Sequence, residues 1–524
     1  MSKAPNIRLP SNEVAPVAPK KSTGPNQATL LAEILKRTTP WHTPDGEAFV
    51  SISVAKAGEN MKDEGHVEHW PIRSKNFRDW LAREFYVQYK KTPSSQAIED
   101  TLRVAEGRAQ FDGPEMNIHL RTARHESSLY IDLGDEKWRA VKCTRDGWEV
   151  IRVSPIPFRR SKGMLPLPEP ERGGSLAELK AFIKVESDDD FQLVLSWLFG
   201  ALHPNGPYTI LILNGVQGSS KSTAARLLRT LIDPNSCPIR AVPRQERDLM
   251  VAGHNSRVLA FDNLSWIPPW LSDALCRIAT GGGFSAREHY TNKDESLIQI
   301  KRPLILNGIP ELATQPDLCD RAIVVDLPPL VQGERKTEAE IDHLFEAAWP
   351  KIFGVLLDAV CCALRREPKI AASGIPLPRM ADFARWVIAA APVLEQPGGA
   401  SFLSAYEDNR KKLVASLLQN DDVLVPGIQQ LLKKEKTWSG TASELKARLQ
   451  RLDCIPVDSV TGLMALPKTP NALSAKLKRL TPALEAVGIL VEWGIREAGT
   501  GRRIIRISRK ADHPRHARAP APGR

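Results

Sequence analysis

The stretch from Tyr208 to Thr223, which reads YTILILNGVQGSSKST, constrains the fold of this chain more than any other. Its first six residues, Tyr208 to Leu213, are apolar or β-branched, which predicts a central strand of a parallel sheet. A glycine-containing loop follows at once, and Thr223 to Ile232 then repeats apolar residues at helical spacing. Strand, loop, Lys-Ser and helix in this order are typical of a phosphate-binding loop.

The chemistry expected of this loop depends on its backbone and on a few side chains. Backbone N–H groups of such a loop surround phosphate oxygens, and the helix N-terminus adds partial positive charge. Lys221 is predicted to reach the β- and γ-phosphates, and Ser222 to hold Mg²⁺. Ser220 stands where glycine usually precedes the lysine, and a plain Gly/Ser turn is the alternative interpretation. The predicted ATP-binding residues are Gly215, Val216, Gln217, Gly218, Ser219, Ser220, Lys221, Ser222 and Thr223.

Bulk properties narrow the class of protein. A chain of 524 residues exceeds a single hydrophobic core and predicts several domains. The net charge of +11 favours a polyanionic partner, nucleic acid first, over a merely basic soluble protein. Seven cysteines without a CxxC pair indicate reduced thiols, with neither disulfides nor a zinc site. The apolar runs are too short to cross a bilayer and the N-terminus lacks a signal-peptide pattern, so we expect a cytoplasmic protein without a membrane partner.

Several polar residues after Lys221 sit at the ends of apolar strands. Arg257 to Asn263 reads as a buried strand that ends at Asp262, a candidate carboxylate for organising Mg²⁺. The strand 303–306 ends in Asn307, and Arg321 directly precedes the strand 322–327. Between Asp262 and the strand 303–306, residues 284–300 alternate as a β-hairpin does, with Lys293 at its tip.

The order of these motifs resembles that of superfamily 3 helicases, the AAA+-type ATPase module of viral and phage primase-helicases. The resemblance covers residues 205–330 and rests on GVQGSSKST, VLAFDN, ATGGGFSAREHYTNKDE, PLILNG and DLCDRAIVV. It implies ATP and Mg²⁺ as cofactors, single-stranded and duplex DNA as partners, and a ring-shaped homo-oligomer, usually a hexamer. It also implies catalytic roles for Lys221, Asp262 as the Walker B acid, Asn307 as the polar sensor, and Arg321 as an arginine finger in a neighbouring subunit's site. The hairpin residues Arg287 and Lys293 are implied as DNA contacts.

One departure from the family pattern concerns hydrolysis. Asn263 stands where the family commonly has a second acid, and an amide cannot act as a general base. Asp262 doing both jobs, help from another carboxylate such as Glu311, and slow turnover all stay open. A turn residue remains the alternative for Asn307, and an ion pair with Asp317 or Asp320 the alternative for Arg321.

The C-terminal third predicts a winged helix. A capping box at Thr441 to Glu444 opens one helix, Thr469-Pro470 opens a second, and a basic hairpin follows. Such an arrangement places a recognition helix and a wing on DNA, although a protein-binding winged helix is the alternative. The expected phosphate contacts are Lys468, Lys476, Arg479, Arg502 and Arg503.

The sequence therefore predicts a multidomain α/β protein with a central P-loop, AAA+-like parallel sheet. The favoured function is an ATP-dependent DNA helicase or replication-initiation ATPase of the primase-helicase type, from a mobile element. An ATP-gated DNA-binding module with little turnover is the alternative that Asn263 favours, and a P-loop small-molecule kinase is a weaker one. The predicted parts are a disordered arm (1–25), an α+β accessory domain (26–175), the P-loop core (176–335), a helical region that forms a lid (336–427), the winged helix (428–508) and a basic disordered tail (509–524).

Overall fold

The structure is a computed structural model of the chain. It describes residues 25–54, 65–287, 295–308, 312–313, 315–330, 333, 335–395, 401–419, 424–452, 466–497 and 501–509. The chain divides into two compact units, residues 1–118 and residues 119–524.

The first unit is a small α+β domain. Helices α1 (Gln27–Leu35), α2 (Lys75–Tyr89) and α3 (Ser95–Phe111) accompany strands β1 (Thr38–His42), β2 (Ala48–Val54) and β3 (His66–Pro71). The strands form an antiparallel sheet in the order β1-β2-β3. The side chains of Ser74 and Ser94 accept hydrogen bonds from backbone N–H groups in the first turns of α2 and α3. Helix α2 buries one apolar face. The sequence did not predict these strands; β3, for example, is half-buried along its length and lacks an apolar alternation.

The predicted accessory domain over 26–175 needs correction, because its second half belongs to the larger unit. Strands β4 (Thr122–His125), β5 (Ser128–Asp132), β6 (Ala140–Cys143) and β7 (Trp148–Ile151) form an antiparallel sheet in that order. One face of this sheet, which includes Leu129, Ile131 and Val141, joins the main hydrophobic core of residues 119–524. The boundary between the two units therefore lies before β4, because apolar residues of the β4–β7 sheet are buried in the same core as helices from later in the chain.

The larger unit is built around a parallel sheet in the order β13-β8-β12-β9. Its strands are β8 (Ile210–Asn214), β9 (Leu259–Leu264), β12 (Leu304–Gly308) and β13 (Ala322–Asp326). Ile210 lies opposite Leu304 on one side and Ala322 on the other, so the strands end at a common level. All residues of β8 and β12 are buried, as expected for strands covered on both faces.

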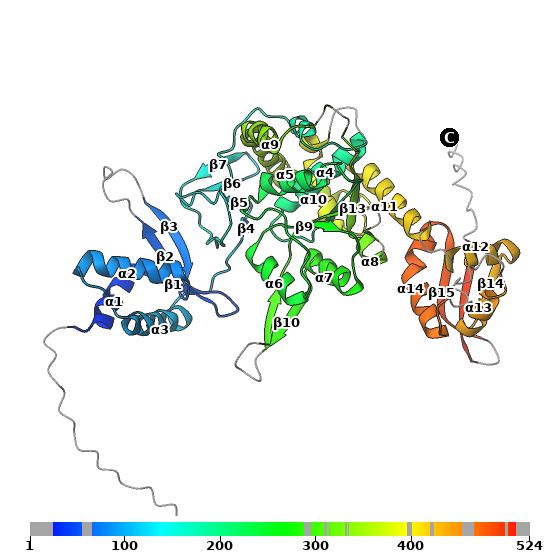
Figure 1. Cartoon of the computed structure of the whole chain (residues 1–524), viewed down its shortest axis with the longest axis horizontal. Helices are drawn as coiled ribbons and strands as arrows, with labels where there is room; N and C mark the ends of the chain where they lie inside the picture. Colours follow the sequence, from blue (N-terminus) through cyan, green and yellow to red (C-terminus); the bar gives the residue numbers. More distant parts are fainter. Residues whose placement is uncertain are drawn as a thin grey trace, which may run out of the picture. The chain divides into compact units, whose positions relative to one another are not determined.

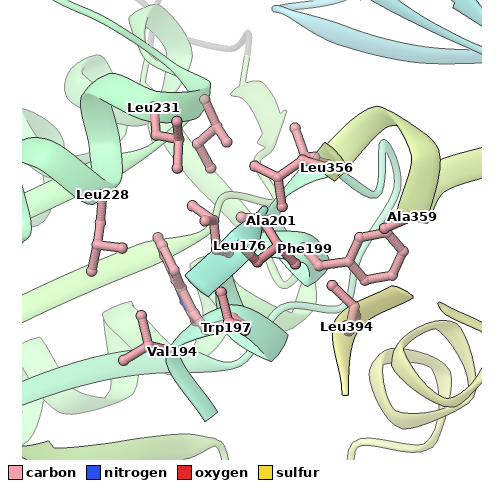
Figure 2. Packing of buried hydrophobic residues seen from close by; sticks show 14 of the residues in the cluster. Leu176, Val194, Trp197, Phe199, Ala201, Leu228, Leu231, Leu356, Ala359 and Leu394 are labelled. Atoms are coloured by element: carbon pink, nitrogen blue, oxygen red, sulfur yellow. The ribbon is translucent and has the colours of Figure 1, made fainter. Parts of the chain in front are cut away.

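Helices cover both faces of this sheet (Figure 1). One core contains residues of α4 (Asp188–Leu202), α5 (Lys221–Ile232), α9 (Glu338–Ala372) and α10 (Ala381–Leu394). Figure 2 shows Trp197 and Phe199 of α4 packed in this core with Leu228 of α5 and Leu356 of α9. The other core contains residues of α6 (Glu246–Asn255) and α7 (Pro269–Thr280).

Helix α9 is apolar enough, and long enough, to cross a membrane by length and composition alone. The sequence pattern predicted no membrane span here, because polar residues interrupt the apolar ones. Of the apolar stretch that meets this criterion, 56% is buried within the protein, as expected for a core helix. Ile352, Phe353 and Leu356 contribute to the main core, so packing inside the protein accounts for the apolar composition of α9.

The remaining elements complete the larger unit. They are the 3-10 helix η1 (Leu176–Ala181), the hairpin β10 (Gly283–Arg287) and β11 (Glu295–Gln299), α8 (Pro316–Cys319), α11 (Phe402–Gln419), α12 (Leu424–Lys434), β14 (Thr437–Gly440), α13 (Ala442–Leu449), α14 (Pro470–Ala486), β15 (Ile489–Arg496) and β16 (Arg503–Arg509). The predicted hairpin over 284–300 is present as an antiparallel β10–β11 pair.

The C-terminal region forms its own core from α12, α13, α14 and an antiparallel sheet in the order β14-β16-β15. The predicted capping box is present, because Thr441 and Glu444 exchange hydrogen bonds with each other's backbone. Thr469 caps α14, and Pro470 occupies its first turn. Strand β14, which was not predicted, lies between the first two helices and pairs with β16.

Candidate functional site

Polar side chains from separate parts of the chain meet at the carboxyl edge of the central sheet. The loop after β8 leads directly into α5, Asp262 lies near the end of β9, and Asn307 lies near the end of β12. Parallel strands bring these positions together, because their carboxyl ends point to the same edge. An open cavity of about 1030 Å³ lies there, lined by Ala181, Phe182, Lys184, residues 217–224, Asp262, Asn263, Asn307, Gly308, Leu327, Leu330, Arg335, Lys336, Glu338 and Ile341.

The loop between β8 and α5 needs glycine where neighbouring atoms leave no room for a side chain and where φ is positive. A Cβ on Gly215 would lie 2.4 Å from Ser219 Oγ and 2.8 Å from the Leu327 carbonyl oxygen, so no side chain fits there. Gly218 has a φ of +83°, in the region that glycine adopts without strain. Ser220 also has a positive φ of +59°, as the residue before α5. A non-glycine residue in this region costs on the order of 1 kcal/mol, which the surrounding loop contacts must offset.

The ammonium group of Lys221 lies over this loop. Its Nζ donates to the carbonyl oxygens of Gly215 and Val216 at 2.7 and 2.8 Å. Burial lowers the pKa of Lys221, and the negative charge of Asp262 opposes that effect. The two carbonyl bonds hold the ammonium group at the wall of the cavity, at the N-terminus of α5, where anionic groups are favoured.

Ser222 and Asp262 form a direct contact across forty positions of sequence. The Ser222 hydroxyl donates to Asp262 Oδ1 at 3.0 Å, and both residues line the cavity. A hydroxyl and a carboxylate are oxygen ligands of the kind that Mg²⁺ prefers. The structure thus brings together the two residues that the sequence predicted as the metal site.

Asn307 is fully buried and joins β12 to the end of β9. Its Oδ1 accepts a hydrogen bond from the Asn263 backbone N–H at 2.9 Å. Its Nδ2 has no hydrogen-bond partner among the residues that the structure describes, although Asn307 lines the cavity. A buried N–H donor without a partner is destabilising, so this group suits a ligand oxygen.

The backbone of Asn263 explains why an amide is tolerated after Asp262. Asn263 has a φ of +57°, and asparagine adopts this left-handed conformation more readily than most other residues do. Its side chain is exposed at the cavity. Glu311, the carboxylate considered from the sequence, lies outside the described residues. Among the described residues that line the cavity, the carboxylates are Asp262 and Glu338.

Arg321 lies at the opposite edge of the sheet from the loop. It precedes β13, whose first residue Ala322 is level with Ile210 at the start of β8. The five steps of β13 place Arg321 roughly 16 Å from the carboxyl edge. Arg321 Nη1 lies 2.9 Å from Asp317 Oδ1, which is the ion pair considered as an alternative role. The strand therefore holds the Arg321 backbone at the edge away from the molecule's own loop.

Sequence reasoning missed three cationic residues of the cavity: Lys184, Arg335 and Lys336. Arg335 Nη2 would lie 3.3 Å from a Cβ on Gly218, so its guanidinium group reaches the loop. Arg335 and Lys336 stand just before Thr337, which opens α9 with a capping box. The capping box could have been recognised in the sequence, because it predicts that a helix begins at this point. It would have placed the two basic residues directly before the N-terminus of that helix.

The predicted DNA-contact residues fall into two groups. Arg287 ends β10, but its side chain lies outside the described residues, as does the whole of Lys293. Lys468, Arg479 and Arg503 are exposed in the C-terminal region, and Lys476 is half-buried.

The prediction for Arg502 needs qualification, because its guanidinium group is within 2.8 Å of Glu497 and 3.3 Å of Glu444. Arg506 and Arg509, which were not predicted, are exposed on the same strand as Arg503, β16. Arg506 is within 3.3 Å of Glu492. In the folded protein, Arg502 and Arg506 therefore lie beside carboxylates, which the sequence pattern did not reveal.

Comparison with protein families gives matches over consecutive parts of the larger unit. Residues 175–413 match a family described as the actinomycete integrative conjugative element replication protein. The chain resembles a replication protein. Residues 425–520 match the C-terminal domain described for the same kind of protein, RepA. The two matched regions correspond to the central sheet with its helices and to the C-terminal core.

Comparison with solved structures finds similar chains of low sequence identity. The apo C-terminal region of NrS-1 is 13% identical, with 91% of this chain and 99% of that chain covered and a TM-score of 0.40. SCCmec type IV Cch, described as an active helicase, is 12% identical, with coverages of 90% and 92% and a TM-score of 0.43. JCV helicase is 13% identical, with coverages of 44% and 66% and a TM-score of 0.20. Among curated proteins, none matches.

Proposed function

We propose that this protein is a replication ATPase that couples ATP hydrolysis to the remodelling of DNA, as a helicase does. The observation that carries the proposal is the 3.0 Å contact between Ser222 and Asp262, beside Lys221 and the glycine-containing loop. These residues come from different elements and share one cavity at the carboxyl edge of a parallel sheet. The matches to a replication protein family support DNA replication as the process.

The residues of the cavity fit Mg·ATP. The loop from Gly215 to Ser220 offers backbone N–H groups, and Lys221 adds a cation for phosphate oxygens. Ser222 and Asp262 would hold the metal, which when bound neutralises charge on the phosphoryl group that is transferred. The Nδ2 of Asn307, which has no hydrogen-bond partner in the described part of the chain, would donate to a phosphate oxygen or to a water molecule. Arg335 and Lys336 add positive charge at the side of the cavity formed by the start of α9.

Hydrolysis would then need a cation from a neighbouring molecule. Arg321 is held roughly 16 Å from the carboxyl edge of its own sheet, so it suits the cavity of an adjacent subunit. A guanidinium group stabilises the charge that develops on the transferring phosphoryl group. This role implies a closed ring, for which we propose a hexamer.

The C-terminal region would bind DNA as a winged helix. Its order of elements is helix, strand, helix, helix and a two-stranded hairpin, with α14 as the recognition helix. Lys468, Arg479 and Arg503 are exposed and suit contacts with DNA phosphates, whereas Arg502 must first leave its carboxylate partners.

The proposal is tested by substituting Lys221→Ala and measuring ATP hydrolysis and strand separation on a DNA fork. We expect the rate of hydrolysis to fall by about 100-fold, because one charge-stabilising donor is lost. Lys369→Ala is the matched control, since Lys369 is exposed on α9 away from the cavity and its loss should leave both activities unchanged. Strand separation at the wild-type rate by Lys221→Ala would refute the proposal.

A second function, an ATP-gated DNA-binding module with little turnover, is favoured by Asn263. Its amide cannot accept a proton from water as the carboxylate expected at that position does. The two functions differ in their response to single-stranded DNA. A motor should hydrolyse ATP several-fold faster when DNA is added, whereas a switch should bind DNA in an ATP-dependent way at a constant, low rate of hydrolysis.

A further inference from the structure

Helix α11 contacts the hydrophobic cores on both faces of the central sheet and that of the C-terminal region. Its first turns, with Phe402 and Tyr406, pack in the core that contains α4 and α9. Leu413 and Leu417 pack in the core on the other face of the sheet. Leu418 packs with α12 and α14 in the C-terminal core. Because close-packed interiors transmit displacements, α11 offers a route by which a displacement of the C-terminal region would act on the central sheet.

On the sheet side, α11 is bonded directly to strand β13. The Asn409 side chain accepts from the Val324 backbone N–H at 3.2 Å and donates to the Val324 carbonyl oxygen at 2.6 Å. β13 ends the described sheet order, and this amide satisfies polar groups at its edge, as a neighbouring strand would. Asn409 is 7% exposed, so these bonds are protected from water. The strand that begins beside Arg321 is thus held by α11.

A chain of ion pairs connects the next residue of α11 to Arg321. Arg410 Nη2 lies 2.8 Å from Asp320 Oδ1, and the other oxygen of Asp320 contacts Arg379. Arg379 also lies 3.5 Å from Asp317, which in turn pairs with Arg321 at 2.9 Å. Asp320 is adjacent to Arg321 in sequence, so the Arg410 contact acts on the Arg321 backbone as well.

We propose that α11 transmits DNA binding by the C-terminal region to Arg321, with Asn409 and Arg410 as positioning residues. This inference rests on the proposed function, because it assumes that Arg321 acts on a neighbouring subunit's nucleotide. DNA that engages α14 and the hairpin shifts α11, and the Asn409 and Arg410 contacts pass that shift to residues 320–324. A misplacement of about 1 Å in a catalytic cation changes a rate by about 100-fold, so a small movement of α11 is sufficient.

The test compares Arg410→Gln with Lys411→Gln in the full chain. Both substitutions remove one positive charge from adjacent positions of α11, but Lys411 is 74% exposed and pairs with Asp408 on its own helix. Two quantities are measured with and without a forked DNA of mixed sequence. One is the ATP hydrolysis rate, and the other is amide hydrogen exchange in the peptide that covers residues 317–326.

In the wild type and in Lys411→Gln, DNA should raise the hydrolysis rate and change exchange in this peptide. In Arg410→Gln both responses should fall about tenfold, while the affinities for nucleotide and for DNA stay within about twofold of wild type. A merely structural role for Arg410 would instead reduce both affinities together with the rate. That result would overturn the inference, as would an unchanged DNA response in Arg410→Gln.

Hydrogen exchange separates this inference from the proposed function. If the wild type shows the exchange response to DNA and Arg410→Gln loses it, but the wild type hydrolyses no ATP, the proposed function fails and the coupling through α11 stands. If the wild type hydrolyses ATP but DNA leaves residues 317–326 unchanged, the coupling is refuted while the ATPase proposal survives.

Discussion

Replacing Asp233 with asparagine should loosen the part of the sheet that carries the candidate site. Asp233 ends α5 and is 4% exposed. One of its carboxylate oxygens accepts from Arg121 Nε at 3.2 Å, and the other accepts from the Val258 backbone N–H at 2.9 Å. Arg229 lies 3.9 Å away. The carboxylate therefore joins the helix of Lys221, the strand of Asp262 and the β4–β7 sheet.

The size of the effect follows from what the substitution leaves behind. Arg121 and Arg229 are 1% and 0% exposed, so Asp233→Asn removes the negative charge that compensates two buried cations. Arg229 Nε and Nη2 have no hydrogen-bond partner among the described residues, so a neutral amide leaves this cluster still less satisfied. Removing one partner of a buried ion pair costs about 3–5 kcal/mol.

Local hydrogen exchange is the appropriate assay, because a chain with several cores does not unfold in one step. A loss of about 4 kcal/mol corresponds to about 1000-fold faster exchange of the most protected amides in β8, α5 and β9. Asp188→Asn is the matched control, since its side chain is 74% exposed and pairs with Lys180; it should cost less than about 1 kcal/mol. Exchange in Asp233→Asn within tenfold of wild type would show that this cluster does not hold the sheet together.

Two further predictions concern pH and salt. Burial lowers the pKa of His203 to about 4, with smaller contributions from Arg257, Arg124 and Lys301. Because the unfolded state binds a proton near pH 6.5 and the folded state near pH 4, stability should fall by up to about 3 kcal/mol as the pH drops through that window. His203→Gln should weaken this pH dependence in the hydrogen-exchange protection of α4, measured from pH 7 to pH 4, and an unchanged slope would contradict the assignment. Arg503→Ala should reduce the slope of log K against log salt for duplex DNA by about 0.9, the amount for one phosphate contact. Arg502→Ala should reduce it less, because Arg502 is held by Glu444 and Glu497; equal losses would show that these ion pairs do not compete with DNA.

The sequence by itself determined the local elements and much of the candidate site. The loop after β8, the helix that follows it and the caps at Thr441 and Thr469 depend on neighbouring residues, so their patterns predict them. The convergence of Ser222, Asp262 and Asn307 was also predictable, because residues at the carboxyl ends of parallel strands meet at one edge. Ser220 and Asn263, the two positions that depart from the expected motifs, both adopt a positive φ, so their residue types fit the local backbone conformation.

Only the tertiary structure decided which distant segments share a core and which charges pair. It moved β4–β7 from the accessory domain to the larger unit, since burial of Leu129 and Ile131 depends on helices that come much later in the chain. It placed Arg335 at the loop and Arg502 beside its carboxylates, because charge pairing acts through space and leaves no periodic trace in the sequence. It also showed that α11 contacts three cores at once, a property of packing that local patterns cannot encode.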